Sequence, residues 1–236
     1  MKKTVLLLTG AVNTDGVPFM KRSDTNIRLI DYRKSIHKWL KNKHLRIVFV
    51  ENSNFPFSEF NIKDSELNRF EYLTYNGQIN SKSRGKGFGE INSFQYAFDN
   101  SEFLKDADYI IKCNGRYYFK NINKLILKIE NSDEDILGNF QRKLTFMDSR
   151  VFVFNKDFFT NYFIKYKGLI DDNKCVYFEH ALAMACHELL SNGGKWGQLP
   201  IPLIIKGYSG TGDFDYDGAL NRMKLWVKFY LQKKLF

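Results

Sequence analysis

Residues 4–10 read TVLLLTG, an unbroken run of β-branched residues and leucines that stops at a Thr-Gly turn. Such a continuous apolar run is typical of a strand that is covered on both faces, as the strands of parallel sheets are. Next along the chain, residues 26–41 repeat isoleucine and leucine at helical spacing, and residues 46–50, RIVFV, form a second short strand pattern. A strand, a helix and a strand within residues 4–50 predict a parallel βαβ unit.

The rest of the chain continues to alternate between the two patterns. No internal repeat or low-complexity linker divides it, so we expect one domain. The sequence therefore predicts an α/β fold in which helices flank a mostly parallel central sheet. The further predicted strands are residues 71–75, 108–112 and 151–154, and the further predicted helices are residues 90–103, 156–166 and 178–192.

Composition limits the class of protein. The 236 residues are 44% hydrophobic and 26% charged, which is ordinary for a globular domain. A formal net charge of +10 suggests an anionic partner, which could be nucleic acid, a phosphorylated substrate or an acidic membrane surface. No apolar stretch of about 18 residues is present, so we expect no membrane-spanning helix. Cys113, Cys175 and Cys186 form no CxxC pair, which disfavours disulfides and zinc and favours a cytoplasmic location.

Four segments carry a family resemblance. They are RIVFVENSN at 46–54, GKGFGEINSFQYAF at 85–98, DADYIIKCNGRYYF at 106–119 and VYFEH at 176–180. In this order and spacing, residues 4–180 resemble the nucleotide-binding half of GT-A fold glycosyltransferases, most closely the inverting family that builds bacterial polysaccharides. The resemblance implies transfer of a sugar from a nucleotide-sugar donor to a saccharide or lipid-linked saccharide acceptor, in the synthesis of a capsule or lipopolysaccharide.

The resemblance also implies a division of the chain. Residues 1–217 would be a GT-A-like domain, with a nucleotide-sugar-binding half at 1–120 and an acceptor-binding half at 121–217. The expected donor-binding residues lie at strand ends and in the loops that follow them. They are Thr9, Gly10, Glu51, Asn52, Ser53, Lys86, Glu90, Lys112, Asn114 and Arg116.

The sequence departs from the family at the place of the acidic pair that holds a divalent ion. Residues 112–116 read KCNGR there, so no metal site is signalled and no cofactor is expected. Cationic side chains can stabilise a departing diphosphate in place of a metal, because their charges and donors suit phosphate oxygens. Lys86, Lys112 and Arg116 are the side chains we expect to do so. The alternative for Lys112 and Arg116 is a solvated strand end or a structural ion pair with Asp106 or Asp108.

Two carboxylates compete for the role of the general base that inverting transfer requires. Inverting members commonly carry a Glu-Asp pair at a helix start, and VYFEH places Glu179 there, with His180 in place of the aspartate. Asp148, at the entry to a predicted strand, is the competitor. His180 and Tyr117 are the expected acceptor-binding residues. Glu179 could equally be an exposed acid near a helix start.

Two glycine-rich segments are predicted to be loops. The first is residues 81–89, in which the stretch 84–89 could bring backbone amides to a phosphate or could be a flexible hairpin, and it fits neither the Walker nor the Rossmann pattern. Residues 207–212 predict a mobile loop that closes over the donor.

The end of the chain, residues 218–236, predicts a basic amphipathic helix. Such a helix could place the protein peripherally on the inner face of an anionic membrane, or could pack on its own domain. Three other functions compete with sugar transfer. They are nucleic-acid binding through basic charge and aromatic stacking, nucleotidyl transfer, which should retain acidic residues for Mg²⁺, and noncatalytic binding of a nucleotide sugar.

Overall fold

A computed structural model of the chain describes residues 2–18, 20–210, 212–216, 227 and 229. The predicted helix at 218–236 therefore lies outside the described residues, apart from Val227 and Phe229. No helix among the described residues is long and apolar enough to cross a membrane.

A seven-stranded sheet runs through the described chain in the order β10-β6-β9-β4-β1-β2-β3. Strands β1, β2, β3 and β4 are all parallel, β9 is antiparallel to both β4 and β6, and β10 is parallel to β6. The sheet joins strands from both halves of the chain. Their bounds are β1 Thr4–Gly10, β2 Arg46–Glu51, β3 Phe70–Thr74, β4 Tyr109–Asn114, β6 Ile136–Leu137, β9 Val151–Asn155 and β10 Trp196–Gly197.

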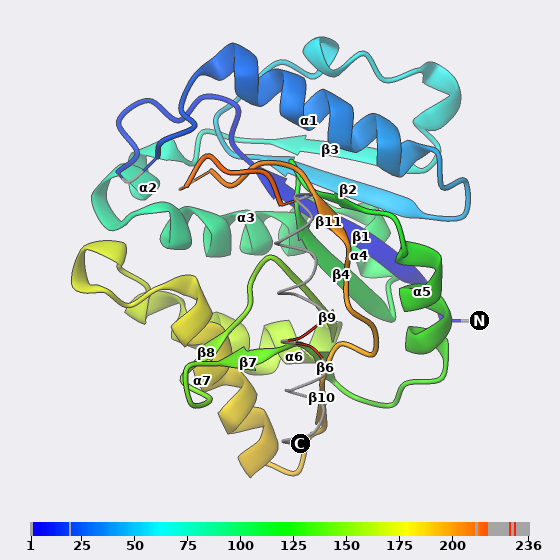
Figure 1. Ribbon diagram of the computed structural model, residues 1–236, viewed down its shortest axis with the longest axis vertical. Helices are drawn as coiled ribbons and strands as arrows, with labels where there is room; N and C mark the ends of the chain where they lie inside the picture. The colour runs from blue at the N-terminus through cyan, green and yellow to red at the C-terminus, as the bar shows by residue number, and fades with distance from the viewer. Residues whose placement is uncertain (1, 19, 211, 217–226, 228, 230–236) are drawn as a thin grey trace.

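Successive side chains of each central strand point alternately into two cores, one on each face of the sheet. In β1, Leu6 and Leu8 pack with helices α1 and α5, whereas Val5 and Leu7 pack with α3, α6 and α7. Figure 1 shows α1 and α3 on opposite sides of β1 to β3. This explains why the β1 sequence is apolar throughout, since both of its faces are covered. The helices are α1 Thr25–Leu40, α2 Gln78–Arg84, α3 Lys86–Asn100, α4 Glu102–Lys105, α5 Ile122–Glu130, α6 Lys156–Asn161 and α7 Phe178–Ser191.

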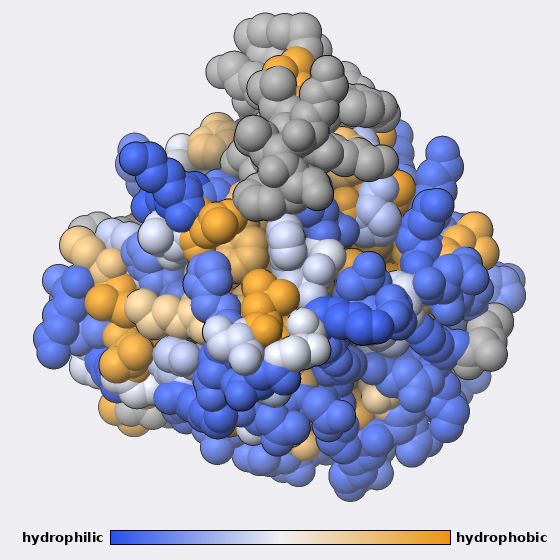
Figure 2. All heavy atoms as spheres, turned by 90° about the horizontal axis from the view of Figure 1, so that it is seen from below, coloured by the Kyte–Doolittle hydropathy of each residue, from blue (hydrophilic) through white to orange (hydrophobic). Residues whose placement is uncertain are grey.

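Two small antiparallel pairs lie outside the main sheet. β5 (Tyr118–Phe119) pairs with β11 (Ile205–Lys206), and β7 (Phe140–Gln141) pairs with β8 (Phe146–Met147). They position the segments at 118–119, 140–147 and 205–206 along the edges of the central layer. The face of the molecule seen in Figure 2 is mostly hydrophilic, with small and separate apolar patches.

The predicted fold class is confirmed, because the sheet is mostly parallel and helices flank both of its faces. The prediction for residues 81–89 was wrong. This segment is helical, with α2 ending and α3 beginning at Gly85, whose φ of +93° turns the chain between them. The glycines that follow serve packing, because a Cβ on Gly89 would lie 2.1 Å from the Ser81 hydroxyl oxygen. Helix α5 and strands β6 and β10 were not predicted.

The strand order reverses direction between β1 and β4, since the chain goes from β1 outward to β2 and β3 and then returns to β4 on the other side. In open α/β sheets, ligands bind outside the carboxyl ends of the strands at such a switch point. The register puts Thr9 of β1 beside Asn114 of β4 there.

Glu51, at the carboxyl end of β2, is fully buried and anchors the loops around this edge. Its carboxylate accepts hydrogen bonds from the backbone amides of Val12 (2.9 Å), Ser53 (3.0 Å) and Phe55 (2.8 Å). It also accepts one from the Thr74 hydroxyl at 3.2 Å. One side chain thus fixes the β1–α1 and β2–β3 connections and the end of β3.

Replacing Glu51 with alanine should destabilise the fold strongly, because several buried donors would lose their acceptor at once. We expect the free energy of unfolding of Glu51→Ala to fall by about 3 kcal/mol, measured by urea denaturation. Glu102→Ala, which removes an exposed carboxylate paired with Lys105, should change it by less than about 0.5 kcal/mol. Equal effects of the two substitutions would contradict the anchoring role of Glu51.

Candidate active site

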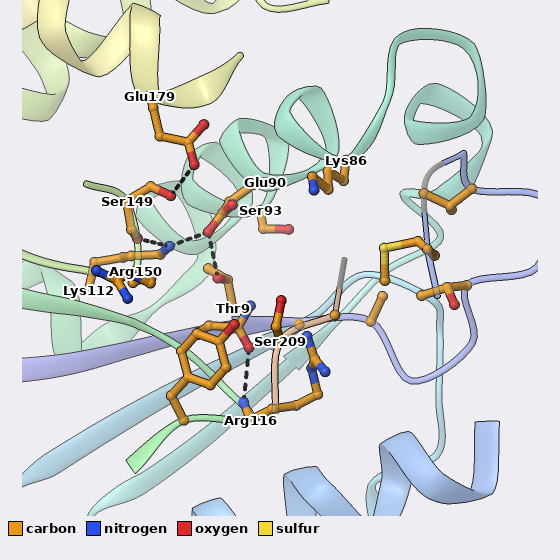
Figure 3. Close-up of a pocket in the computed structure, with 18 of the residues that line it drawn as sticks. Thr9, Lys86, Glu90, Ser93, Lys112, Arg116, Ser149, Arg150, Glu179 and Ser209 are labelled. Atoms are coloured by element: carbon orange, nitrogen blue, oxygen red, sulfur yellow. Dashed lines mark hydrogen bonds and ion pairs between the residues drawn. The ribbon is translucent and has the colours of Figure 1, made fainter. Parts of the chain in front are cut away.

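A cavity of about 650 Å³ opens at the carboxyl edge of the sheet, beside the β1–β4 switch point (Figure 3). Side chains reach it from β1, β4, α3 and α7, and part of its wall is formed by Ser209, Gly210, Phe214 and Tyr216. The cavity brings together predicted residues that are far apart in the sequence. Those that line it are Thr9, Gly10, Asn52, Lys86, Glu90, Lys112, Asn114, Arg116, Tyr117, Asp148 and Glu179.

Three predicted site residues are not among the lining residues. Glu51 lies behind the wall as the loop anchor, and the Ser53 hydroxyl donates to the same carboxylate. His180 contributes to the start of α7, where its Nδ1 accepts a hydrogen bond from the Tyr177 amide at 3.1 Å. The His180 ring also meets the ring of Phe146, which does line the cavity, edge to face at 5.2 Å.

Lys112 lies at the floor of the cavity with only 1% of its surface exposed. Its ammonium group forms an ion pair with Glu90 of α3 and donates a hydrogen bond to the Ser149 carbonyl at 2.6 Å. The Thr9 hydroxyl donates to the same Glu90 carboxylate at 3.2 Å. Figure 3 shows this chain of contacts crossing the floor. Lys112 therefore forms a structural ion pair, but the expected partners were wrong, because it pairs with Glu90 while Asp106 and Asp108 contact Lys3.

Arg116 is the cation that remains available for a ligand at the end of β4. It is 95% buried, since 5% of its surface is exposed, and its Nε has no hydrogen-bond partner. One terminal nitrogen donates to the Tyr208 carbonyl at 3.3 Å, which places Arg116 against the beginning of the glycine-rich segment. No acidic side chain of the described chain forms an ion pair with it.

The two competing carboxylates have different surroundings. Asp148 accepts two hydrogen bonds from the Arg150 Nε, at 2.9 and 3.2 Å, forms an ion pair with the same guanidinium, and accepts from Gln141 at 3.1 Å. Glu179, at the start of α7, accepts one hydrogen bond, from the Ser149 hydroxyl at 2.7 Å. Burial raises the pKa of Glu179 above its usual 4.5, which is how enzymes bring a carboxyl group toward the pH at which it moves protons. The geometry therefore favours Glu179 over Asp148 as a base.

Several lining residues were missed at the level of the sequence. Arg28 of α1 is buried, and its guanidinium donates to the Ala11 carbonyl at 2.9 Å. Burial lowers the pKa of Arg28, and the nearby charge of Arg116 lowers it further. Both guanidinium groups line the cavity. The available signal in the sequence was an arginine at helical spacing with Tyr32 and Ile36, on the buried face of α1. The other missed residues include Thr14, Gln78, Arg142, Phe146, Ser149 and Arg150.

The start of α3 does not present free amides to the cavity. Asp172 accepts a hydrogen bond from the Gly87 amide at 3.3 Å, and a Cβ on Gly85 would lie 2.4 Å from its side chain. A carboxylate therefore takes the place that a phosphate would need at this helix end. The interpretation of residues 84–89 as a phosphate-binding loop has no support from this geometry.

A divalent ion has few ligands to use here. Within the described ranges, no group of three or more His, Cys, Asp and Glu side chains is gathered at one place. The acidic side chains that line the cavity are Glu90, Asp148 and Glu179, and two of these are already ion-paired. Hard cations such as Mg²⁺ prefer several carboxylate or carbonyl oxygens together. The residues present do not fit such a site.

Comparison with known proteins gives similarities of chain path only. No family model matches the chain, and no curated protein does. Among solved structures, the chain is similar to HddC from Yersinia pseudotuberculosis, at 16% identity over 97% of this chain and 100% of that one, with a TM-score of 0.42. It is also similar to the galactosyltransferase LgtC in complex with donor and acceptor sugar analogs, at 10% identity over 81% and 72%, with a TM-score of 0.46. A third similar structure is mouse xyloside xylosyltransferase 1, at 10% identity over 83% and 85%, with a TM-score of 0.45.

The raised pKa of Glu179 predicts a pH-dependent stability. Above the usual value of 4.5, the unfolded chain releases this proton before the folded protein does. The folded state then binds more protons, so the stability of the wild type falls as the pH rises from about 4.5 through the folded pKa. Glu179→Gln keeps an acceptor for Ser149 and cannot ionise. The stability of this variant relative to wild type, measured by denaturation at several pH values, should therefore rise across that window. A constant difference would show that the pKa is not raised.

Proposed function

We propose that this chain is a glycosyltransferase that moves a sugar from a nucleotide-sugar donor to a saccharide or lipid-linked saccharide acceptor, with inversion and without a divalent ion, in bacterial surface polysaccharide synthesis. One observation carries the proposal. A cavity at the switch point of the sheet has basic side chains on one side and a carboxyl group of raised pKa, Glu179, on the other. These are the two groups that transfer from a nucleotide sugar requires.

The donor side has unsatisfied polar groups that a nucleotide could satisfy. Buried polar atoms in proteins nearly always have a partner, so exceptions that line a cavity point to a ligand. Here the Thr14 hydroxyl, the Gln78 carbonyl oxygen and the Arg116 Nε are buried without one. Arg116 and Arg28 are close enough for their charges to repel. A diphosphate held by Arg116 would relieve that repulsion and stabilise the leaving group.

The proposed reaction is a single displacement. Glu179 accepts the proton of the acceptor hydroxyl, the acceptor oxygen forms a bond to the anomeric carbon, and the bond from that carbon to the nucleoside diphosphate breaks. The negative charge that develops on the leaving oxygen is stabilised by Arg116. A double displacement would need a second carboxylate free to act as the nucleophile. Asp148 and Glu90 are held in ion pairs, which favours inversion.

The positions of the aromatic side chains do not support the nucleic-acid alternative, which depended on rings that stack on bases. Most of the large rings pack in the two cores, and Phe94 alone lies within 6.1 Å of five other phenylalanine rings. Rings that are buried in a core cannot stack on bases. The basic charge then fits a phosphorylated substrate better than a polymer.

Arg116→Ala should weaken the binding of nucleoside diphosphates and nucleotide sugars. Loss of a charge-assisted contact to phosphate corresponds to roughly a 10- to 100-fold higher Kd, measured by calorimetry over a panel of nucleotides. Lys120→Ala, an exposed lysine that does not line the cavity, is the control and should leave the Kd unchanged. If no nucleotide or nucleotide sugar binds the wild type, the proposal is wrong. If a chelator abolishes binding or turnover, the metal-independent form of it is wrong.

Glu179→Gln should lower kcat by about 10²- to 10⁴-fold, because the amide cannot accept the acceptor's proton. The Kd for the donor should stay within about twofold of wild type, since Glu179 is placed on the acceptor side. Glu188→Gln, farther along α7 and paired with Lys165, is a matched control that should retain kcat. Nucleotide release from a donor and acceptor mixture reports the rate. Wild-type turnover in Glu179→Gln would transfer the role of base to Asp148.

A further inference from the structure

The β7–β8 hairpin extends a cationic side chain into the cavity wall from outside the predicted site. Three successive non-glycine residues at its tip, Arg142, Lys143 and Leu144, have positive φ angles of 48°, 54° and 69°. Left-handed backbone is unfavourable for side chains with a Cβ, so surrounding contacts must hold this conformation. The Thr145 hydroxyl donates to the Arg142 carbonyl at 2.8 Å, and the His187 ring lies 2.9 Å from the Leu144 carbonyl oxygen. The conformation of the tip is therefore held by specific hydrogen bonds.

Arg142 lines the cavity and lies 4.3 Å above the centre of the Phe146 ring, which lines it too. Cation–π contact holds the guanidinium in place while its N–H donors stay available. Behind Phe146 is the ring of His180, the residue after Glu179. Arg142 and Phe146 thus line the same cavity as the proposed base, Glu179.

Arg142 differs from two other cationic side chains of the cavity because it has no acidic partner among the described residues. Lys112 is paired with Glu90, and Arg150 is paired with Asp148. Arg116 serves the diphosphate in the proposed reaction. Arg142 forms no ion pair with any acidic side chain in the part of the chain that the structure describes. Its guanidinium is therefore available to bind an anionic group in the cavity that it lines.

We propose that Arg142 and Phe146 form an acceptor subsite that selects a saccharide bearing an anionic group, with the guanidinium binding the anion and the ring packing on the sugar. This rests on the proposed function, because it assigns the acceptor of the same site. The shared chemistry is an oxyanion next to a sugar ring. A carboxylate on the sugar or a phosphate ester would both provide it, and arginine binds either in a bidentate manner.

The test measures direct binding of three probes to the full chain by NMR titration. They are methyl glucoside, which is neutral, methyl glucuronide, which carries a carboxylate, and methyl glucoside 6-phosphate. The wild type should bind at least one anionic probe about tenfold more tightly than the neutral probe. The anionic probe that binds more tightly shows whether the subsite takes a carboxylate or a phosphate. Equal binding of all three, or binding of none, would overturn the subsite.

Arg142→Gln should remove the preference for the anionic probe and leave binding of the neutral probe within about twofold. Arg142→Lys should restore part of the preference. Lys143→Gln is the matched control, since it removes the neighbouring charge from the same exposed tip, with a similar φ angle and away from the cavity lining. If Arg142→Gln keeps the preference, or if Lys143→Gln loses it equally, Arg142 does not select the ligand.

Nucleotide-sugar binding, measured separately, keeps the two proposals apart. A protein that binds nucleotide sugars but shows no anionic preference would retain the proposed function and lose the subsite. A protein that prefers anionic saccharides through Arg142 but binds no nucleotide sugar would retain the subsite and lose the proposed function.

Discussion

The ammonium group of Lys112 lies inside the molecule, between the carboxylate of Glu90 and the carbonyl of Ser149. A buried charge is costly unless a partner of opposite charge and hydrogen bonds compensate it, so these groups have to stay together. Since Lys112 comes from β4, Glu90 from α3 and Ser149 from the turn before β9, the pair fixes three parts of the chain relative to each other. The floor of the cavity follows from that constraint.

The same contacts connect the two sides of the site. Ser149 uses its carbonyl for Lys112 and its hydroxyl for Glu179, while Glu90 also accepts from Thr9 on β1. A continuous series of polar contacts therefore runs from the end of β1, where a donor would lie, to the start of α7, where an acceptor would lie. A buried polar network is stabilising only when every member has its partners. Removing one of these side chains should therefore destabilise the contacts of its neighbours in the network.

The sequence predicted what depends on local pattern and missed what depends on long-range packing. The apolar run of β1 and the helical pattern of α1 were enough to predict the parallel βαβ unit, but not the strand order. The glycines at 85–89 were misinterpreted because glycine looks the same whether it makes a loop or admits a close neighbour, and only the structure shows Ser81 against Gly89. Glu51 was placed in the donor site for a similar reason, since a carboxylate after a strand can bind a ligand or its own backbone.

The position of Arg142 in the cavity wall could not be predicted from the sequence. Nothing in the local sequence indicates that a hairpin tip far from the predicted donor residues lies in the same cavity wall, because only tertiary packing brings it there. The pairing of Lys112 has a related consequence. The sequence places a cation where the family that it resembles has an acidic pair, but the structure shows that Glu90 already balances its charge. Arg116, in the turn that follows β4, forms no ion pair among the described residues, so in the proposed function its charge, and not that of Lys112, would act on the diphosphate.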